Sequence, residues 1–531
     1  MSFRFGKLLQ SSFGTAAATF ASRLCGLFRV RLEATVLGGG VWASAWGLAL
    51  MVPNLFRRLL GEGALGTALI PLVAEMEQRE GIDAVRRKLA TVLIALGMLL
   101  ALIVLVISLA ALGSGKWIAL YGNEFWRSAR ITQMIRLLPL LMPYAFFICL
   151  TGVIGAVLNY AKIFVRPALT ALLFNLFMLA GLGAAWLGHW SPETVLPFLA
   201  VLTPAAGAIQ LALMLWMLSL CGRYPRFVSV WWNDREILCK LWRLALPGIL
   251  GYGALQVSFL VDRSLAVALG DRAVPALNYV DRVIDLPIGI FAVSLGSVLM
   301  SAMSRAAAEG DRETMREQLA FSLRHVWFLC APLAAGVVFF HADILRVLCL
   351  GGRYTLDDLR AARMVAVFYG LGIPFFCTLK VLLPAFYARK QMKTPFYVSL
   401  AAITVNITLN LILMWPLRQG GIALATVISS LVNNGMLMAV LCRQGMGVGW
   451  RVARSPLRSA AVAAVSGSAV WYGLHRAGIG LAGCGGMGAN ILLLAGIAAA
   501  FGVLYFGLSA LCRAPELREL AALLRRRGGR G

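Results

Sequence analysis

The sequence predicts an all-α polytopic membrane protein with about fourteen transmembrane helices. Hydrophobic residues make up 60% of the chain and charged residues only 14%, whereas soluble globular proteins carry about 25% charged residues. Apolar runs of roughly 20 residues, long enough to cross a bilayer as a helix, recur along the whole sequence. Helices are expected because a backbone in lipid must satisfy its own hydrogen bonds.

The apolar runs give the order of the elements, and most of them are followed by Gly, Pro or basic residues, which favour loops and helix ends. The expected helices cover residues 8–36, 42–75, 87–113, 128–159, 164–188, 193–221, 240–269, 273–305, 318–343, 361–389, 394–416, 420–443, 456–475 and 488–513.

The formal net charge of +26 comes mainly from Lys and Arg in alternate loops and in both termini. By the positive-inside rule these loops are cytoplasmic, and an even number of helices places both termini there. The loop at residues 346–363 is an exception, because it carries several arginines on the outer side. This distribution favours a membrane protein over a nucleic-acid-binding one. No removable signal peptide is expected at the start.

An internal repeat relates two halves of the chain. The segment that starts at Leu65 matches the one that starts at Leu295, and a loop ending at Pro167 matches one ending at Pro395, with an offset of about 230 residues. Both members of each pair lie on the same predicted side, so the repeat is parallel and predicts two six-helix lobes around a central cavity. The expected domains are 1–222, 223–445 with an interfacial linker at its start, and 446–531 with two extra helices and a basic tail.

Several arginines lie inside the first two apolar segments. Arg23, Arg29 and Arg57 are the candidates for a cavity that takes an anion, because a charge at membrane depth usually faces a bundle interior or a water-filled cavity. Helical spacing places Ser22 and Arg29 on one face. The alternative is that the arginines extend to an interface. Glu62 is either an ion-pair partner of Arg57 or a solvated loop carboxylate.

The second helix contains Pro53, which should break or kink it, and Asn54 can satisfy the freed backbone groups. In the eighth predicted helix, Asp281, Arg282 and Asp285 lie within one apolar run. Such charges favour a functional site, and a structural ion-pair network is the alternative.

A further polar group comprises Asp262, Asn406, Asn410 and Thr426 in the seventh, eleventh and twelfth predicted helices. Their oxygens are hard ligands that suit an alkali cation. Hydrogen bonding between helices is the alternative interpretation.

Features typical of enzymes do not emerge from the sequence. The ten cysteines and four histidines show no metal-ligand spacing, and no nucleophile–base constellation or phosphate-binding loop is present. The sequence therefore predicts a protein that is not an enzyme and has no cofactor.

Three motifs, SRLCGLFR from Ser22, VPNLFRRLLGEGA from Val52 and YVDRVIDLP from Tyr279, resemble the MurJ (MviN) family of lipid II flippases. The similarity runs from the N-terminus to about residue 440. It implies a transporter of the bacterial cytoplasmic membrane, in peptidoglycan synthesis, that moves lipid II between leaflets by alternating access. Lipid II, membrane lipids and other cell-wall synthesis proteins are the implied partners.

The resemblance also assigns residues. The motif positions imply that arginines bind the substrate pyrophosphate and that acidic residues accompany them, namely Arg23, Arg29, Arg57, Arg282, Glu62, Asp281 and Asp285. Some members have a sodium site, to which Asp262, Asn406, Asn410 and Thr426 could correspond, with Na⁺ as the coupling ion. The family usually has an aspartate after the first helix, where this chain has Ser44. The alternatives are a flippase for another polyprenyl-linked glycan and a cation-coupled multidrug exporter of the same superfamily.

Overall fold

A computed structural model describes residues 2–61, 64–161, 163, 165–226, 235–289, 293–478 and 486–519. The described part of the chain is helical apart from short connections and one isolated bridge between Gly351 and Tyr354. Within it, nine helices are long and apolar enough to cross a membrane. The all-α polytopic fold class is confirmed.

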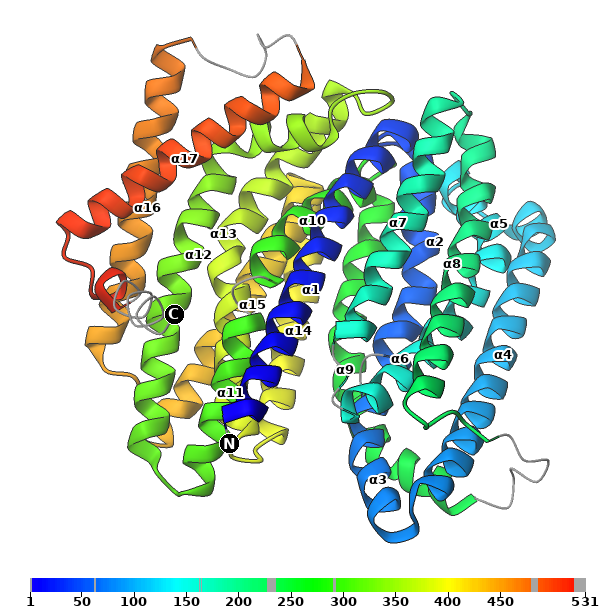
Figure 1. Ribbon diagram of the computed structural model, residues 1–531. Coiled ribbons are helices and arrows are strands. Elements are labelled where there is room, and N and C mark those ends of the chain that lie inside the picture. The colour runs from blue at the N-terminus through cyan, green and yellow to red at the C-terminus, as the bar shows by residue number, and fades with distance from the viewer. Residues whose placement is uncertain are drawn as a thin grey trace. The chain divides into compact units, whose positions relative to one another are not determined.

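The chain divides into two compact units. Unit 1 comprises residues 1–275 with 351–354, and unit 2 comprises residues 276–350 with 355–531. The domain boundaries expected from the repeat remain a prediction. The helices of unit 1 are α1 (Ser2–Leu37), α2 (Val41–Phe56), the π-helical turn η1 (Arg57–Gly61), α3 (Ala64–Glu80), α4 (Ile82–Tyr121), α5 (Ala129–Leu141), α6 (Pro143–Tyr160), α7 (Val165–Leu187), α8 (Pro192–Leu220) and α9 (Arg235–Ala268) (Figure 1).

Helix α10 (Ala273–Pro287) begins at the end of unit 1 and continues into unit 2. The remaining helices of unit 2 are α11 (Val293–Ala308), α12 (Arg312–Cys349), α13 (Leu356–Tyr387), α14 (Lys393–Leu417), α15 (Gln419–Arg443), α16 (Trp450–Arg476) and α17 (Met487–Leu511). Each predicted apolar segment therefore contains at least one helix. Three of them (42–75, 128–159 and 273–305) are divided.

The division of the second segment follows Pro53, as the sequence predicted. Helix α2 continues through Pro53 to Phe56, and the chain then forms the π-helical turn η1. Residues 288–289, after α10, are also π-helical. The two π-helical sites are about 230 residues apart, which is the offset of the sequence repeat. The repeat therefore extends to local backbone geometry.

The core of unit 1 is a continuous apolar cluster contributed by α3, α4, α6, α8 and α9. Val73, Val153 and Leu158 are fully buried in it. Burial of such side chains stabilises a fold by roughly 1.5–3 kcal/mol each in water, and inside a bilayer close packing takes over that role. The result is a packed support for η1, which contacts α3 and α6.

Unit 2 is organised around α12, which packs against α11, α13, α16 and α17 (Figure 1). The helix begins at Arg312 because Asp311 caps it, accepting hydrogen bonds from the backbone and hydroxyl of Thr314. These bonds hold the pKa of the Asp311 carboxyl below its ordinary value. Helix α17 is attached to α12 by a hydrogen bond in which the Tyr505 hydroxyl donates to the Phe328 carbonyl oxygen at 2.7 Å.

Candidate functional site

Arg29 is a buried cation on α1, with only 7% of its surface exposed. Its Nε lies 3.2 Å from a carboxylate oxygen of Glu33, one turn later and also buried. Its Nη1 donates to the side-chain oxygen of Asn175 on α7 at 3.1 Å. The guanidinium carbon also lies 5.5 Å from the ring centroid of Phe174. A carboxylate, an amide and an aromatic face thus fix the direction of this guanidinium.

Asn175 joins two turns of α1. Its side-chain oxygen accepts from Arg29, and its amide nitrogen donates to the Ser22 carbonyl oxygen at 3.0 Å and to the Ser22 hydroxyl at 3.3 Å. Ser22 and Arg29 therefore lie on one face of α1, as the helical spacing predicted, and that face contacts α7. Arg23 belongs to the same turn and is half-buried.

The η1 turn carries the next candidate, Arg57. Asn54 donates from its side chain to the Leu50 carbonyl oxygen at 2.9 Å and accepts from Arg57 Nε at 3.1 Å. The Leu50 carbonyl is not the one that Pro53 frees, which is that of Ala49, so the role of Asn54 toward a freed backbone group stays a prediction. The same side chain also directs Arg57. The prediction for Glu62 lies outside the described residues.

Arg58, next to Arg57, packs within unit 1. Its Nη1 donates to the Gln256 side-chain oxygen at 3.0 Å, and its guanidinium carbon lies 5.0 Å from the ring centroid of Phe259. Arg263, 2% exposed, approaches the same ring at 4.7 Å. Both partners of Arg58 lie on α9. The Arg-Arg motif therefore connects the broken second helix with α9.

The acidic motif of the eighth predicted helix lies on α10. The Arg282 and Asp285 side chains are exposed and Asp281 is half-buried. These residues belong to unit 2, whereas Arg23, Arg29 and Arg57 belong to unit 1. Their joint role in one site remains a prediction.

Three of the candidate cation ligands come together in unit 2. Asn410, fully buried, donates to the Asn406 side-chain oxygen at 3.2 Å, and the Asn406 amide nitrogen lies 3.5 Å from the Thr426 hydroxyl. That hydroxyl donates to the Ile422 carbonyl oxygen at 3.0 Å. These contacts form the hydrogen-bonded chain of the alternative interpretation. Asp262 is buried on α9 of unit 1.

The fit of these residues to a cation is partial. The amide and hydroxyl oxygens are hard but neutral, and Asn406 already accepts a hydrogen bond from Asn410. Asn406, Asn410 and Thr426 therefore supply no negative charge of their own to a monovalent cation. Among the described residues, no group of three or more His, Cys, Asp or Glu side chains is placed to hold a metal ion.

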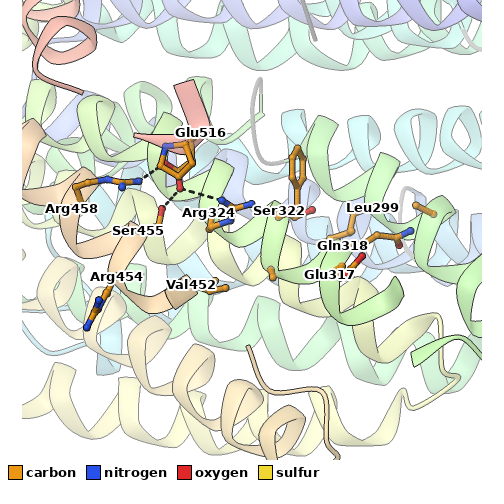
Figure 2. Close-up of a pocket in the computed structure, with 14 residues that line it drawn as sticks. Leu299, Glu317, Gln318, Ser322, Arg324, Val452, Arg454, Ser455, Arg458 and Glu516 are labelled. Carbon is orange, nitrogen blue, oxygen red and sulfur yellow. Dashed lines mark hydrogen bonds and ion pairs between the residues drawn. The ribbon is translucent and has the colours of Figure 1, made fainter. Parts of the chain in front are cut away.

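A cavity of about 940 Å³ lies elsewhere, in unit 2, between α11, α12, α16 and residues 515–516. Figure 2 shows its polar wall, where the fully buried Glu516 accepts from Ser455 at 2.6 Å and pairs with Arg458 and, at 3.8 Å, Arg324. This cluster was not among the residues predicted from the sequence. The one signal for it in the sequence is Glu516, a carboxylate just after the last apolar segment.

Buried arginines held by polar partners, together with nine helices in the described part of the chain that are long and apolar enough to cross a membrane, indicate a polytopic membrane protein. Comparison with known proteins makes this more specific. A sequence profile of the family described as "Lipid II flippase MurJ" matches residues 33–479. The chain belongs to this family.

The relatives agree over most of their length. The chain is 31% identical over 475 residues to a "Probable lipid II flippase MurJ" from Rhizobium tropici, covering 88% of this chain and 87% of the relative. It is 29% identical over 521 residues to a Vibrio cholerae protein of the same name, covering 92% and 97%. A Burkholderia cenocepacia "Lipid II flippase MurJ" is 26% identical over 83% of this chain and 84% of the relative.

Solved structures support the same fold. A structure of lipid II flippase MurJ in an inward closed conformation superposes with a TM-score of 0.72 at 22% identity, covering 93% of this chain and 98% of that chain. An inward-facing multidrug resistance transporter of the MATE family gives a TM-score of 0.64 at 15% identity, covering 81% and 98%. At these identities the likeness establishes the architecture alone.

Proposed function

We propose that this protein moves lipid II from the inner to the outer leaflet of the bacterial cytoplasmic membrane. The match of the family profile over residues 33–479 is the observation that carries this proposal. The names of the relatives from Rhizobium tropici and Vibrio cholerae support it. No catalytic step is required, because the substrate changes its leaflet and not its covalent structure.

Arginines bind the pyrophosphate of the substrate in this proposal. The set comprises Arg23, Arg29, Arg57 and Arg282, accompanied by Glu62, Asp281 and Asp285. A diphosphate needs fixed positive charge and paired donors, which the planar guanidinium provides. The contacts of Arg29 with Glu33 and Asn175 support this role, since a guanidinium already held in one direction loses less entropy on binding.

Transport proceeds by alternating access, with the polyprenyl tail in lipid while the polar head crosses through the cavity. Both termini face the cytoplasm, as the basic loops predict. An inside-negative potential opposes inward return of an anion by about 2.3 kcal/mol per charge per 100 mV. Binding of Na⁺ by Asp262, Asn406, Asn410 and Thr426 is a second proposed source of coupling.

The experiment is complementation of a bacterial strain depleted of its own lipid II flippase. Wild type is expected to restore growth, and Arg29→Ala and Arg57→Ala are expected to fail although they insert normally in the membrane. Arg79→Ala is the matched control, because the Arg79 side chain is 75% exposed and forms its ion pair with Glu75, one turn earlier on the same helix. Growth supported by Arg57→Ala at normal expression would contradict the assignment of the arginines.

A cation-coupled drug exporter is the competing function, and the architecture shared with the MATE-family structure is its basis. Such a protein favours acidic and aromatic cavity residues over arginine. Properly inserted wild type that fails to restore growth, but lowers drug accumulation in cells, would favour the exporter. Rescue of a strain that lacks a flippase for another polyprenyl-linked glycan would instead favour that substrate.

A further inference from the structure

The η1 turn rests directly on the backbone of α6. A β-carbon built at Gly152 of α6 would lie 2.8 Å from the Gly61 Cα atom, and closer still to the Gly61 carbonyl carbon and oxygen. Real β-carbons essentially never approach backbone atoms this closely. The contact therefore excludes every residue except glycine at position 152 unless η1 or α6 moves.

Packing around Gly61, on the η1 side of this contact, is also close. A β-carbon at Gly61 would lie 3.3 Å from the Cys149 Cα atom, 3.4 Å from the Ile148 carbonyl oxygen and 3.8 Å from Arg57 Cγ. The first two atoms belong to the backbone of α6 and cannot rotate away. The third belongs to the arginine that the sequence motif assigns to the substrate.

Gly155, one turn further along α6, provides a contrast. A β-carbon there would meet only the terminal methyl group of Met214, at 3.8 Å, which is an ordinary contact with a flexible side chain. Packing therefore requires glycine at position 152 of α6, whereas a β-carbon fits at position 155.

The direction of Arg57 depends on the position of this turn. Its Nε is bonded to Asn54 and its neighbour Arg58 to Gln256, so both guanidinium groups are tied to side chains on either side of η1. A shift of the η1 backbone would change both hydrogen bonds together. Single π-helical turns of this kind occur often at functional sites.

We infer that Gly152 is a positioning residue for the substrate-binding arginine Arg57, because its lack of a side chain seats η1 on α6. The inference rests on the proposed function of the arginines. It assigns to α6 a role in substrate binding although Gly152 itself offers no group that could contact a diphosphate.

The test measures the affinity of purified full-length protein in detergent for lipid II, together with the amount of folded protein and its thermal unfolding midpoint. The affinity of the folded protein for lipid II is expected to fall most where the added β-carbon clashes most. We expect a loss of about tenfold or more for Gly152→Ala, a smaller loss for Gly61→Ala, and less than about twofold for Gly155→Ala. In an Arg57→Ala background, Gly152→Ala should add little further loss, because the group that it positions is absent.

A purely structural role would lower the amount of folded protein and leave the affinity of the folded fraction unchanged. Wild-type affinity in folded Gly152→Ala, or an equal loss in Gly155→Ala, would overturn the inference. If Gly152→Ala does not fold, the affinity of folded Gly61→Ala, whose clash is milder, becomes the deciding measurement. A wild-type affinity in that variant would overturn the inference. Wild type that binds no lipid II would overturn the proposed function itself, and the inference with it.

Discussion

At the scale of the residue, the ion pair of Arg29 and Glu33 has energetic consequences of its own. Both residues are buried, with 7% and 8% of their surfaces exposed. Loss of one partner of a buried pair leaves an uncompensated charge and typically costs about 3–5 kcal/mol, whereas replacement of both by apolar residues is often nearly neutral. The pair should therefore show strong coupling in a double-mutant cycle.

Glu33→Leu and Arg29→Met are each expected to lower the stability of the detergent-solubilised protein by about 3 kcal/mol, and the double variant by clearly less than their sum. Chemical unfolding followed by fluorescence of the intrinsic tryptophans measures the difference. Additive losses in the two single variants would show that the two charges do not compensate each other.

Part of this site follows from sequence and part does not. The helical period places Ser22 and Arg29 on one face, and an i, i+4 spacing relates Arg29 to Glu33. The pairing of Arg29 with Glu33 could therefore have been predicted from this spacing alone. Asn175 could not be found in this way, because its contacts with Ser22 and Arg29 arise only when α1 and α7, far apart in sequence, pack together.

At the scale of the element, the segment Gly351–Tyr354 shows how a loop can belong to the packing of a distant helix. The Arg353 N–H donates to the Thr35 carbonyl oxygen at 2.9 Å, near the end of α1. Gly38 follows with φ +77°, and a β-carbon there would lie 2.8 Å from the Arg353 carbonyl oxygen, closer than real β-carbons approach the backbone. The backbone conformation and the loop therefore both favour glycine at position 38.

Gly38→Ala is therefore expected to lower the free energy of unfolding by more than about 1–2 kcal/mol, the cost of the left-handed backbone conformation alone, because its β-carbon would also meet the Arg353 carbonyl oxygen. Chemical unfolding of the detergent-solubilised protein measures the loss. Gly40→Ala is the control, since no atom lies within 4 Å of a β-carbon at Gly40. Equal losses in both variants would contradict this placement of the loop.

Residues 515–519 are held in unit 2 by a buried carboxylate. Glu516 is fully buried beside Arg458, Arg324 and Ser455 (Figure 2). The Glu519 side chain is 34% exposed and pairs with Arg324 at 3.2 Å. Burial makes the first group costly to neutralise and solvent screens the second.

Glu516→Gln is expected to lower the free energy of unfolding by about 3 kcal/mol, because it leaves two arginines beside a neutral group. Glu519→Gln should cost less than about 1 kcal/mol. Thermal unfolding of the two variants under identical conditions makes the comparison. A larger effect at Glu519 would contradict the assignment of Glu516 as the anchor.

The positions of the helices along the chain could be predicted from the sequence better than the points at which they are divided. Apolar runs located the membrane helices, and Pro53 marked the break in the second, because both are properties of the local sequence. The π-helical turn that follows depends on the contact of Gly61 with Gly152, which no local pattern encodes. The long segments 128–159 and 273–305 were likewise expected as single helices, and they are divided at Met142 and after Pro287.

At the scale of the whole molecule, the repeat of about 230 residues gave the architecture and the motifs gave the family. The profile match over residues 33–479 and the TM-score of 0.72 with a MurJ structure agree with both. Local sequence patterns do not predict the proposed cooperation between the arginines of unit 1 and the charges of α10. It belongs to the proposed transport cycle, in which alternating access would change the relation between the lobes.

In the proposed function, the protein carries lipid II across the membrane by means of its arginines. The direct test measures the fraction of lipid II accessible from outside in flippase-depleted cells, using an added reagent that modifies lipid II and cannot cross the membrane. Wild type is expected to restore external lipid II, and Arg57→Ala to leave it inside at equal expression. External lipid II that stays at the depleted level with properly inserted wild type would contradict the account.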